Sequence, residues 1–289
     1  MRFKAICLMI CSLMLYEASA QAETIDICGD LKQGELIILK APNTVSINIE
    51  NNSGEKSYQV TSDGISLIAL HRDAPQKIIL DSIAKNGKIT HYSTKIALTK
   101  WDIQKISGVP QSKVTPTSPR DLSEIKREQK DVGHAVTHYE RGDAWRKGFI
   151  LPVEGQISGN FGNQRIFNGT PKSPHTGTDI AAPEGTPVKA SGDGQVILSG
   201  KKYFYTGNMV IIDHGQGLQT IYAHLKEAKV KKGDFVHQGD IIGAVGKTGR
   251  ATGAHLHWGA SLNNVRFRPH SLLDINTKKC RQIEEMNRR

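Results

Sequence analysis

The chain has 289 residues, of which 38% are hydrophobic and 23% are charged, and its formal net charge is +10. This balance excludes a polytopic membrane protein and a wholly disordered chain. The length suits two domains, or one domain with a long extension. The basic excess lies toward the C-terminal half and favours an anionic polymer or membrane surface as partner. No nucleic-acid-binding motif accompanies it, so nucleic acid is not an expected partner.

The N-terminus has the features of an export signal. Arg2 and Lys4 precede an apolar run over residues 5–16, and the small residues 18–20 form an A-x-A cleavage pattern. The apolar run is shorter than the roughly 20 residues that a bilayer-spanning helix needs. The sequence therefore predicts a signal peptide at residues 1–20, a periplasmic or secreted protein, and no transmembrane segment in the mature chain.

Two cysteines, Cys28 and Cys280, remain after removal of the signal peptide. An oxidising compartment permits a disulfide between them. The sequence alone does not say whether their Cα atoms come within about 7 Å, as a bridge requires. A bridge and two free thiols therefore both stay open.

Residues 21–106 are expected to form an N-terminal accessory β domain. Apolar and polar residues alternate over short runs at 35–39, 45–49, 65–70 and 77–80, with turn signals between them. This pattern is typical of a small antiparallel sheet.

Residues 107–147 are expected to be a linker followed by an amphipathic helix. Three prolines between 109 and 119 give the segment a linker composition. Within 121–140, apolar residues recur on one helical face, namely Leu122, Ile125, Val132 and Val136.

Two histidines of this predicted helix, His134 and His138, stand four residues apart and could share a metal ion. No cysteine or carboxylate in the local sequence completes such a site. Two solvated histidines are the favoured interpretation.

From residue 148 the pattern changes to glycine-punctuated strands. Residues 188–198 and 230–243 each read as a hairpin-like unit with Gly-Asp turns. The second unit is similar to the half-barrel of biotinyl and lipoyl carrier domains, but it lacks an attachment lysine at the turn. The predicted fold is mainly β, with an antiparallel β-sandwich or half-barrel over 148–275 and a basic tail at 276–289.

The histidines that offer chemistry lie in three short motifs of this C-terminal part. His175 and Asp179 are four positions apart, and His255 and His257 are two apart, which puts both imidazoles on one face of a strand. A fourth imidazole, His224, stands in Tyr-Ala-His-Leu. A catalytic zinc ion takes three His, Asp or Glu ligands and leaves one position open.

These motifs, with their surroundings, closely resemble the lysostaphin-type (LytM-like) zinc endopeptidases of bacterial cell walls. The resemblance covers about residues 150–275 in order and rests on the segments Gly159–Gly162, His175–Asp179, Ala182–Val188, Gly207–Asn208, Asp213–Gly215, Tyr222–Leu225 and Gly253–His257.

The resemblance implies one Zn²⁺ ion per chain, bound by His175, Asp179 and His257. It places His224 and His255 beside the metal without ligating it, as a general base and an oxyanion stabiliser. His255 is suited to the role of general base and His224 to that of oxyanion stabiliser, and the opposite assignment stays open.

Several other residues are expected at the rim of the cleft. In similar proteins the position of Asn208 presents a polar side chain to the cleft, although an asparagine serving a turn is an equal alternative. The loop residues Lys201, Lys202, Tyr203, Tyr205 and Arg250 could meet an anionic glycan-peptide.

The resemblance implies an enzyme that hydrolyses amide bonds in peptidoglycan peptides, with the D-alanyl-diaminopimelate cross-link favoured over glycine bridges. The alternative is a non-catalytic LytM-like regulator that binds the wall or activates an amidase. The N-terminal part is expected to cover the cleft, to dock an envelope regulatory partner, or to act as a spacer.

Overall fold

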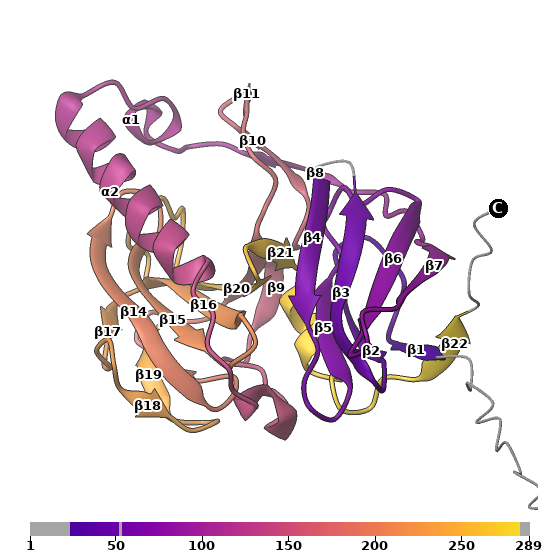
Figure 1. Ribbon diagram of the computed structural model, residues 1–289. Helices are drawn as coiled ribbons and strands as arrows, with labels where there is room; N and C mark the ends of the chain where they lie inside the picture. Colours follow the sequence, from indigo (N-terminus) through magenta and orange to yellow (C-terminus); the bar gives the residue numbers. More distant parts are fainter. Residues whose placement is uncertain (1–23, 52–53, 284–289) are drawn as a thin grey trace, which may run out of the picture.

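The computed structural model describes residues 24–51 and 54–283 and is mainly β, as expected (Figure 1). The predicted signal peptide at 1–20 and residues 284–289 of the predicted tail lie outside the described residues. Within the described ranges, none of the helices combines the length and apolarity that a membrane crossing needs.

The N-terminal part contains two four-stranded antiparallel sheets. One has the order β22-β1-β2-β5, with β1 (Ile25–Cys28), β2 (Leu36–Lys40), β5 (Ile65–Ala69) and β22 (Cys280–Ile283). The other has the order β4-β3-β6-β7, with β3 (Thr44–Asn51), β4 (Gly54–Gln59), β6 (Lys77–Ala84) and β7 (Ile89–Lys95). Part of the predicted basic tail is thus a strand, β22, of the N-terminal sheet, because its backbone pairs with β1.

The C-terminal part is organised around one eight-stranded antiparallel sheet of order β18-β14-β15-β16-β20-β12-β9, with β21 paired to β20. Its strands are β9 (Gln156–Gly159), β12 (Gly177–Ala181), β14 (Gly194–Tyr203), β15 (Gly207–Asp213), β16 (Leu218–Leu225), β18 (Phe235–Val236), β20 (His255–Leu262) and β21 (Val265–Phe267). A small sheet, β13-β19-β17, consists of β13 (Pro187–Lys189), β19 (Ile241–Ala244) and β17 (Glu227–Ala228).

A third small sheet joins the two parts of the chain. Its order is β11-β10-β8, with β8 (Ile103–Ile106), β10 (Gln164–Phe167) and β11 (Thr170–Pro171). The β8–β10 pair is parallel. Residues 103–106, expected in the N-terminal domain, therefore extend the C-terminal part.

The predicted amphipathic helix exists as α2 (Pro119–Val136), preceded by the short α1 (Gln111–Val114). Ser118 accepts a hydrogen bond from the amide of Asp121, and Pro119 starts the helix. Ile125 and Val136 are buried as expected, but Leu122 is exposed. The short 3₁₀ helices η1 (Ala144–Lys147) and η2 (Pro269–Leu272) complete the helical elements of the described chain.

Helix α2 lies against the large sheet (Figure 1). Ala135 and Val136 pack with Ile197, Met209 and other buried side chains of β14, β15 and β16. The linker helix therefore covers one face of the C-terminal sheet.

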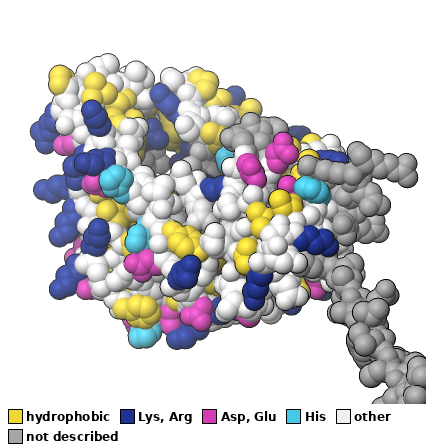
Figure 2. All heavy atoms as spheres, in the orientation of Figure 1, with side chains coloured by type: hydrophobic (Ala, Val, Ile, Leu, Met, Phe, Trp, Pro, Cys, Tyr) yellow, Lys and Arg dark blue, Asp and Glu magenta, His cyan; other side chains and the backbone are white. Residues whose placement is uncertain are grey.

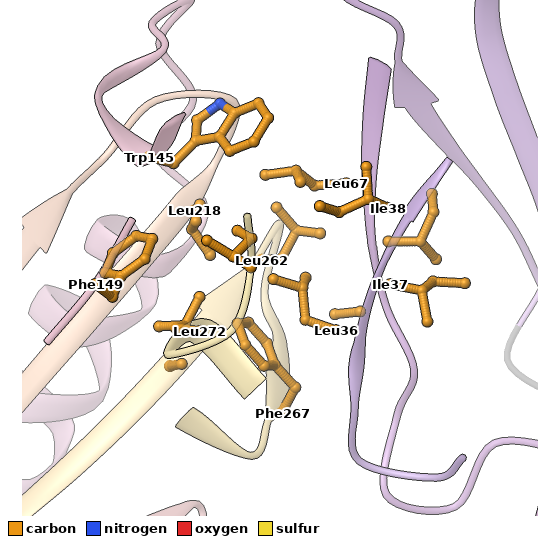
Figure 3. Close-up of a cluster of buried hydrophobic side chains, with 14 of the residues drawn as sticks. Leu36, Ile37, Ile38, Leu67, Trp145, Phe149, Leu218, Leu262, Phe267 and Leu272 are labelled. Atoms are coloured by element: carbon orange, nitrogen blue, oxygen red, sulfur yellow. The ribbon is translucent and has the colours of Figure 1, made fainter. Parts of the chain in front are cut away.

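One contiguous hydrophobic cluster runs through both parts of the chain (Figure 3). Leu36 of β2 faces Leu262 and Phe267 of the C-terminal strands within it, whereas Ile37 points to the other side of β2. At its edge, Arg268 donates two hydrogen bonds to the carboxylate of Glu35, at 2.7 and 2.9 Å, and fixes β2 against the C-terminal part.

Cys28 and Cys280 form a disulfide, which answers the question that the sequence left open. They stand directly opposite each other in the antiparallel pair β1–β22. The bridge closes a sequence separation of 252 residues.

Exposed basic side chains gather along the side of the molecule where α2 and β14 lie (Figure 2). On α2 they include Lys126, Arg127 and Lys130, and on β14 Lys201 and Lys202. This surface agrees with the basic excess of the sequence.

We predict that replacing both cysteines, Cys28→Ser with Cys280→Ser, lowers the free energy of unfolding by about 2–5 kcal/mol, because the bridge restricts the unfolded chain over a long loop. Urea unfolding of the variant and the oxidised parent measures the difference. Equal midpoints would contradict the prediction.

A buried histidine gives a second prediction. Burial lowers the pKa of His214 to about 4. Its Nδ1 donates to the carbonyl of Asp193 at 2.6 Å, and its Nε2 lies 2.7 Å from the hydroxyl of Thr220, which is a neutral imidazole's pattern. In the unfolded chain the same imidazole binds a proton near pH 6.5. Its contribution to the free energy of unfolding is therefore fully present above pH 6.5 and is lost as the pH falls toward 4, by up to about 3 kcal/mol.

We therefore expect the free energy of unfolding to fall less between pH 7.5 and 4.5 in His214→Gln than in the parent. Urea unfolding at both pH values measures the difference, and an NMR titration of the parent's imidazole reports the pKa directly. An equal fall in both proteins, or an imidazole that titrates near pH 6.5, would contradict the assignment.

Candidate metal centre and active site

Strand pairing brings two of the predicted ligands together. In the antiparallel pair β12–β20, Asp179 stands directly opposite His257. Cross-strand partners point to the same face of a sheet, so the carboxylate and the imidazole meet there. His175 lies just before β12, and its ring faces that of His257, with centroids 4.9 Å apart.

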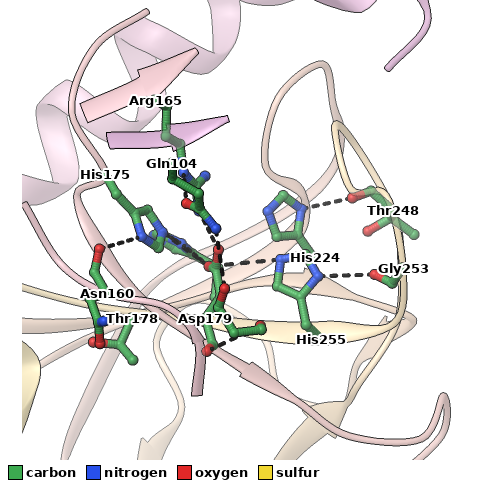
Figure 4. A network of polar contacts seen from close by, with 12 residues as sticks. Gln104, Asn160, Arg165, His175, Thr178, Asp179, His224, Thr248, Gly253 and His255 are labelled. Atoms are coloured by element: carbon green, nitrogen blue, oxygen red, sulfur yellow. Dashed lines mark hydrogen bonds and ion pairs between the residues drawn. The ribbon is translucent and has the colours of Figure 1, made fainter. Parts of the chain in front are cut away.

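Three ligand-type atoms converge on one point (Figure 4). His175 Nε2 lies 3.0 Å from His257 Nδ1 and 3.0 Å from Asp179 Oδ1, and His257 Nδ1 lies 2.9 Å from the same oxygen. Zinc bonds of about 2.0–2.1 Å in a tetrahedron put ligand atoms roughly 3.3 Å apart. The triangle is therefore the right size for one metal ion.

Hydrogen bonds fix the protonation of His175. Its Nδ1 lies 3.0 Å from the carbonyl oxygen of Asn160, which can only accept, so Nδ1 carries the proton. The bare Nε2 then faces the carboxylate of Asp179, and two acceptors face each other until a cation lies between them. This donor set of two imidazoles and one carboxylate fits a catalytic zinc site.

The titration of these groups favours metal binding. Burial lowers the pKa of His175 and lowers that of His257 to about 4, so both are neutral at pH 7. Burial alone would raise the pKa of Asp179, but its contacts with His175 and His257 hold the pKa well below its ordinary value. Protons therefore compete weakly for all three ligands.

The second oxygen of Asp179 is occupied by a residue that the sequence analysis missed. Arg165 of β10 contacts Asp179 Oδ2, and its Nε donates to Gln104 of β8 at 3.2 Å (Figure 4). Gly159 makes room, because a Cβ there would come within 2.8 Å of that oxygen. Asp179 thus offers only Oδ1 to a metal.

His224 and His255 lie beside the triangle. Their rings are 4.7 Å apart, and His255 Nε2 is 3.7 Å from Asp179 Oδ1. His224 Nδ1 donates to the carbonyl of Thr248 at 2.8 Å, and His255 Nδ1 to that of Gly253 at 2.9 Å. Both therefore present a bare Nε2, which accepts protons.

A backbone irregularity turns His224 toward the site. Ala223 pairs with His257 in β16–β20, so strict alternation would send the next side chain to the other face. His224 instead has φ +61°, a conformation rare for a side chain of this size. Its amide donates to the carbonyl of Thr206 at 2.9 Å.

The site opens into a cleft of about 130 Å³. Its lining includes Asp179 and His255 of the site, Gln104 and Ile106 of β8, and Arg250 of the loop before β20. The segment that precedes α2 thus forms one wall of the cleft.

Asn208 is committed to backbone atoms. Its Oδ1 accepts from the amide of Lys202 at 3.1 Å, and its Nδ2 donates to the carbonyls of Leu225 and Lys226 at 3.1 and 2.9 Å. These contacts favour the turn-serving alternative, and a contact with substrate stays a prediction. Tyr203, expected at the rim, is buried and donates to Asp131 of α2 at 2.8 Å.

A second group of ligand-type residues involves His138, which lies beyond the end of α2 and not on it. Its Nε2 lies 3.4 Å from a Glu140 oxygen and 3.8 Å from Asp213 Oδ2. Glu140 lies two residues after His138 in the sequence, but Asp213 comes from β15, so local spacing reveals only part of this group. His134 is exposed and takes no part in this group.

The part of the chain that contains His175, Asp179 and His257 also matches a known family. The model of the family "Peptidase family M23" matches residues 173–269. The chain is 42% identical over 144 residues to peptidoglycan DD-endopeptidase ShyA of Vibrio cholerae, a match of 48% of this chain and 33% of that one. It is 49% identical over 98 residues to DD-carboxypeptidase/endopeptidase Mpg of Neisseria meningitidis, covering 34% and 22%.

The chain thus spans a third or less of the length of these relatives. A solved structure from Pseudomonas aeruginosa, assigned to peptidase M23, covers 85% of this chain and 96% of its own, with a TM-score of 0.66 and 28% identity. Because this structure covers 85% of the chain, the similarity in fold extends beyond residues 173–269. The chain therefore contains a domain, over residues 173–269, that matches peptidase family M23.

Proposed function

We propose that this chain is a zinc endopeptidase that hydrolyses amide cross-links between peptidoglycan peptides, with the D-alanyl-diaminopimelate bond as the favoured substrate. The convergence of His175 Nε2, Asp179 Oδ1 and His257 Nδ1 carries the proposal. The names of the relatives ShyA and Mpg support the reaction and the polymer. The disulfide supports an oxidising compartment outside the cytoplasm, in line with the predicted signal peptide.

His175, Asp179 and His257 hold the metal in this proposal. A bound zinc ion supplies Lewis-acid chemistry, polarising the scissile carbonyl and bringing water toward deprotonation near neutral pH. Arg165 keeps Asp179 Oδ2 away from the metal, and the carbonyl of Asn160 orients the ring of His175.

His255 is the proposed general base. Its Nε2 is bare and lies at the cleft wall, so it can accept a proton from water and return it to the leaving amine. His224 also presents a bare Nε2 and can accept a hydrogen bond from the same water. To stabilise an oxyanion, as the resemblance implies, His224 must first become protonated at Nε2.

We predict that Arg165→Gln weakens zinc binding about 10- to 100-fold, because Asp179 loses the partner that orients it. Asp179→Ala should lose stoichiometric zinc altogether, and Arg120→Gln, which removes an exposed arginine of α2, should bind as the parent does. Competition with a chromophoric chelator measures each affinity. Parent-like binding by Arg165→Gln would contradict the positioning role.

We further predict that the zinc-loaded protein releases cross-link peptides from purified sacculi, identified by mass. His255→Ala should lower the rate about 10²- to 10⁴-fold while keeping its zinc, because the base acts beside the metal. His134→Ala removes an exposed histidine and is the matched control.

Two outcomes would contradict the proposal. A zinc-loaded parent that releases no peptide, yet stimulates a wall amidase, would favour the non-catalytic regulator. A parent-like rate in His255→Ala, with a large loss in His224→Ala, would transfer the base role to His224. An envelope regulatory partner stays a prediction.

A further inference from the structure

A second arginine in the cleft, Arg250, makes no ion pair within the described residues, although the carboxylate of Glu128 acts on it at longer range. Arg250 Cζ lies 4.5 Å from the centroid of the Phe167 ring and 4.4 Å from that of Tyr205, so the guanidinium sits against two aromatic faces. Within the described chain, its side chain has no hydrogen bond or ion pair to a protein group.

Arg250 differs from Arg165, whose guanidinium already has hydrogen-bond partners. Arg165 is occupied by Asp179 Oδ2 and Gln104. Arg250 is half-buried, and burial lowers its pKa. Folding has already removed part of the water around this guanidinium, and its N–H donors have no protein partner. An acceptor that enters the cleft therefore forms a strong, charge-assisted hydrogen bond with little further desolvation of Arg250.

The charge of the cleft selects the acceptor. Asp179 is the acidic residue in its lining, and both of its oxygens are already used, by the ligand group and by Arg165. The two arginines, Arg165 and Arg250, outweigh the one carboxylate, so the cleft lining carries a net positive charge, and a bound metal ion would increase it. The complementary ligand is an anion, and for a peptide substrate it is a carboxylate.

The surroundings hold Arg250 in place for such a contact. Its amide donates to the carbonyl of Tyr205 at 2.8 Å. The buried carboxylate of Glu128, on α2, accepts from the amides of Tyr205 and Thr206, both at 2.9 Å. The helix thus fixes the loop whose ring stacks on Arg250, and little conformational freedom is lost on binding.

We propose that Arg250 binds the free carboxylate beside the scissile amide, on the side of the leaving amine. This inference rests on the proposed function. In a D-alanyl-diaminopimelate cross-link, the carbon that bears the acylated amine also bears a carboxylate, whereas a residue inside a glycine bridge carries none. The planar fork of Arg250 matches a carboxylate with two parallel hydrogen bonds.

The test uses two synthetic cross-linked peptides that differ only at this group, one with the free carboxylate and one with its carboxamide. We expect the zinc-loaded parent to cleave the carboxylate form with a kcat/KM about 10- to 100-fold higher. Arg250→Gln should lose this preference, mainly through its rate on the carboxylate form. Arg250→Lys should keep part of it, because charge remains without the fork.

Arg120→Gln is the matched control, since Arg120 is an exposed arginine of α2 with no place in the cleft lining. It should keep the parent preference, and zinc content should equal that of the parent in every variant. A preference of the same size in Arg250→Gln, or none in the parent, would overturn the inference and leave the endopeptidase proposal standing. A parent that cleaves neither peptide would overturn both.

Discussion

Three electron-pair donors held about 3.0 Å apart are the constraint on which the rest of the site depends. At this distance the bare Nε2 of His175 and the carboxylate of Asp179, both acceptors, repel each other unless a proton or a metal ion lies between them. The fold enforces the approach because Asp179 and His257 are cross-strand partners, buried between strands that continue on both sides. Arg165 and the carbonyl of Asn160 then fix which atoms of Asp179 and His175 face the centre.

The segments outside the matched family domain contribute directly to this arrangement. Strand β8 supplies Gln104, which holds Arg165, and it walls the cleft. Helix α2 supplies Glu128, which holds the loop of Tyr205. A hydrophobic cluster and a disulfide unite the N-terminal sheets with the C-terminal part. The cleft is therefore lined by residues that precede residue 173 as well as by residues 173–269.

The sequence was informative where chemistry depends on local spacing. Alternation along a strand put His255 and His257 on one face, and the short separation of His175 and Asp179 indicated a shared site. Apolar periodicity predicted α2, although it placed the exposed Leu122 on the packed face. The helix ends at Val136, so the expected i, i+4 relation of His134 and His138 on a helix was wrong.

Residues whose roles depend on long-range pairing could not be predicted in the same way. Gln104 and Arg165 are 61 positions apart and meet only because β8 and β10 pair in parallel. The positive φ of His224 breaks the alternation from which its direction would have been inferred. The bridge between Cys28 and Cys280 and the strand β22 likewise require the two chain ends to meet.

The most direct test of the central claim is a crystal structure of the zinc-loaded protein with anomalous scattering recorded at the zinc edge. The account predicts a single strong anomalous peak within about 2.0–2.2 Å of His175 Nε2, Asp179 Oδ1 and His257 Nδ1, with a fourth position free for water or substrate. A zinc ion bound instead by His224 and His255, or a fully loaded protein with no anomalous peak among the three ligands, would contradict the central claim.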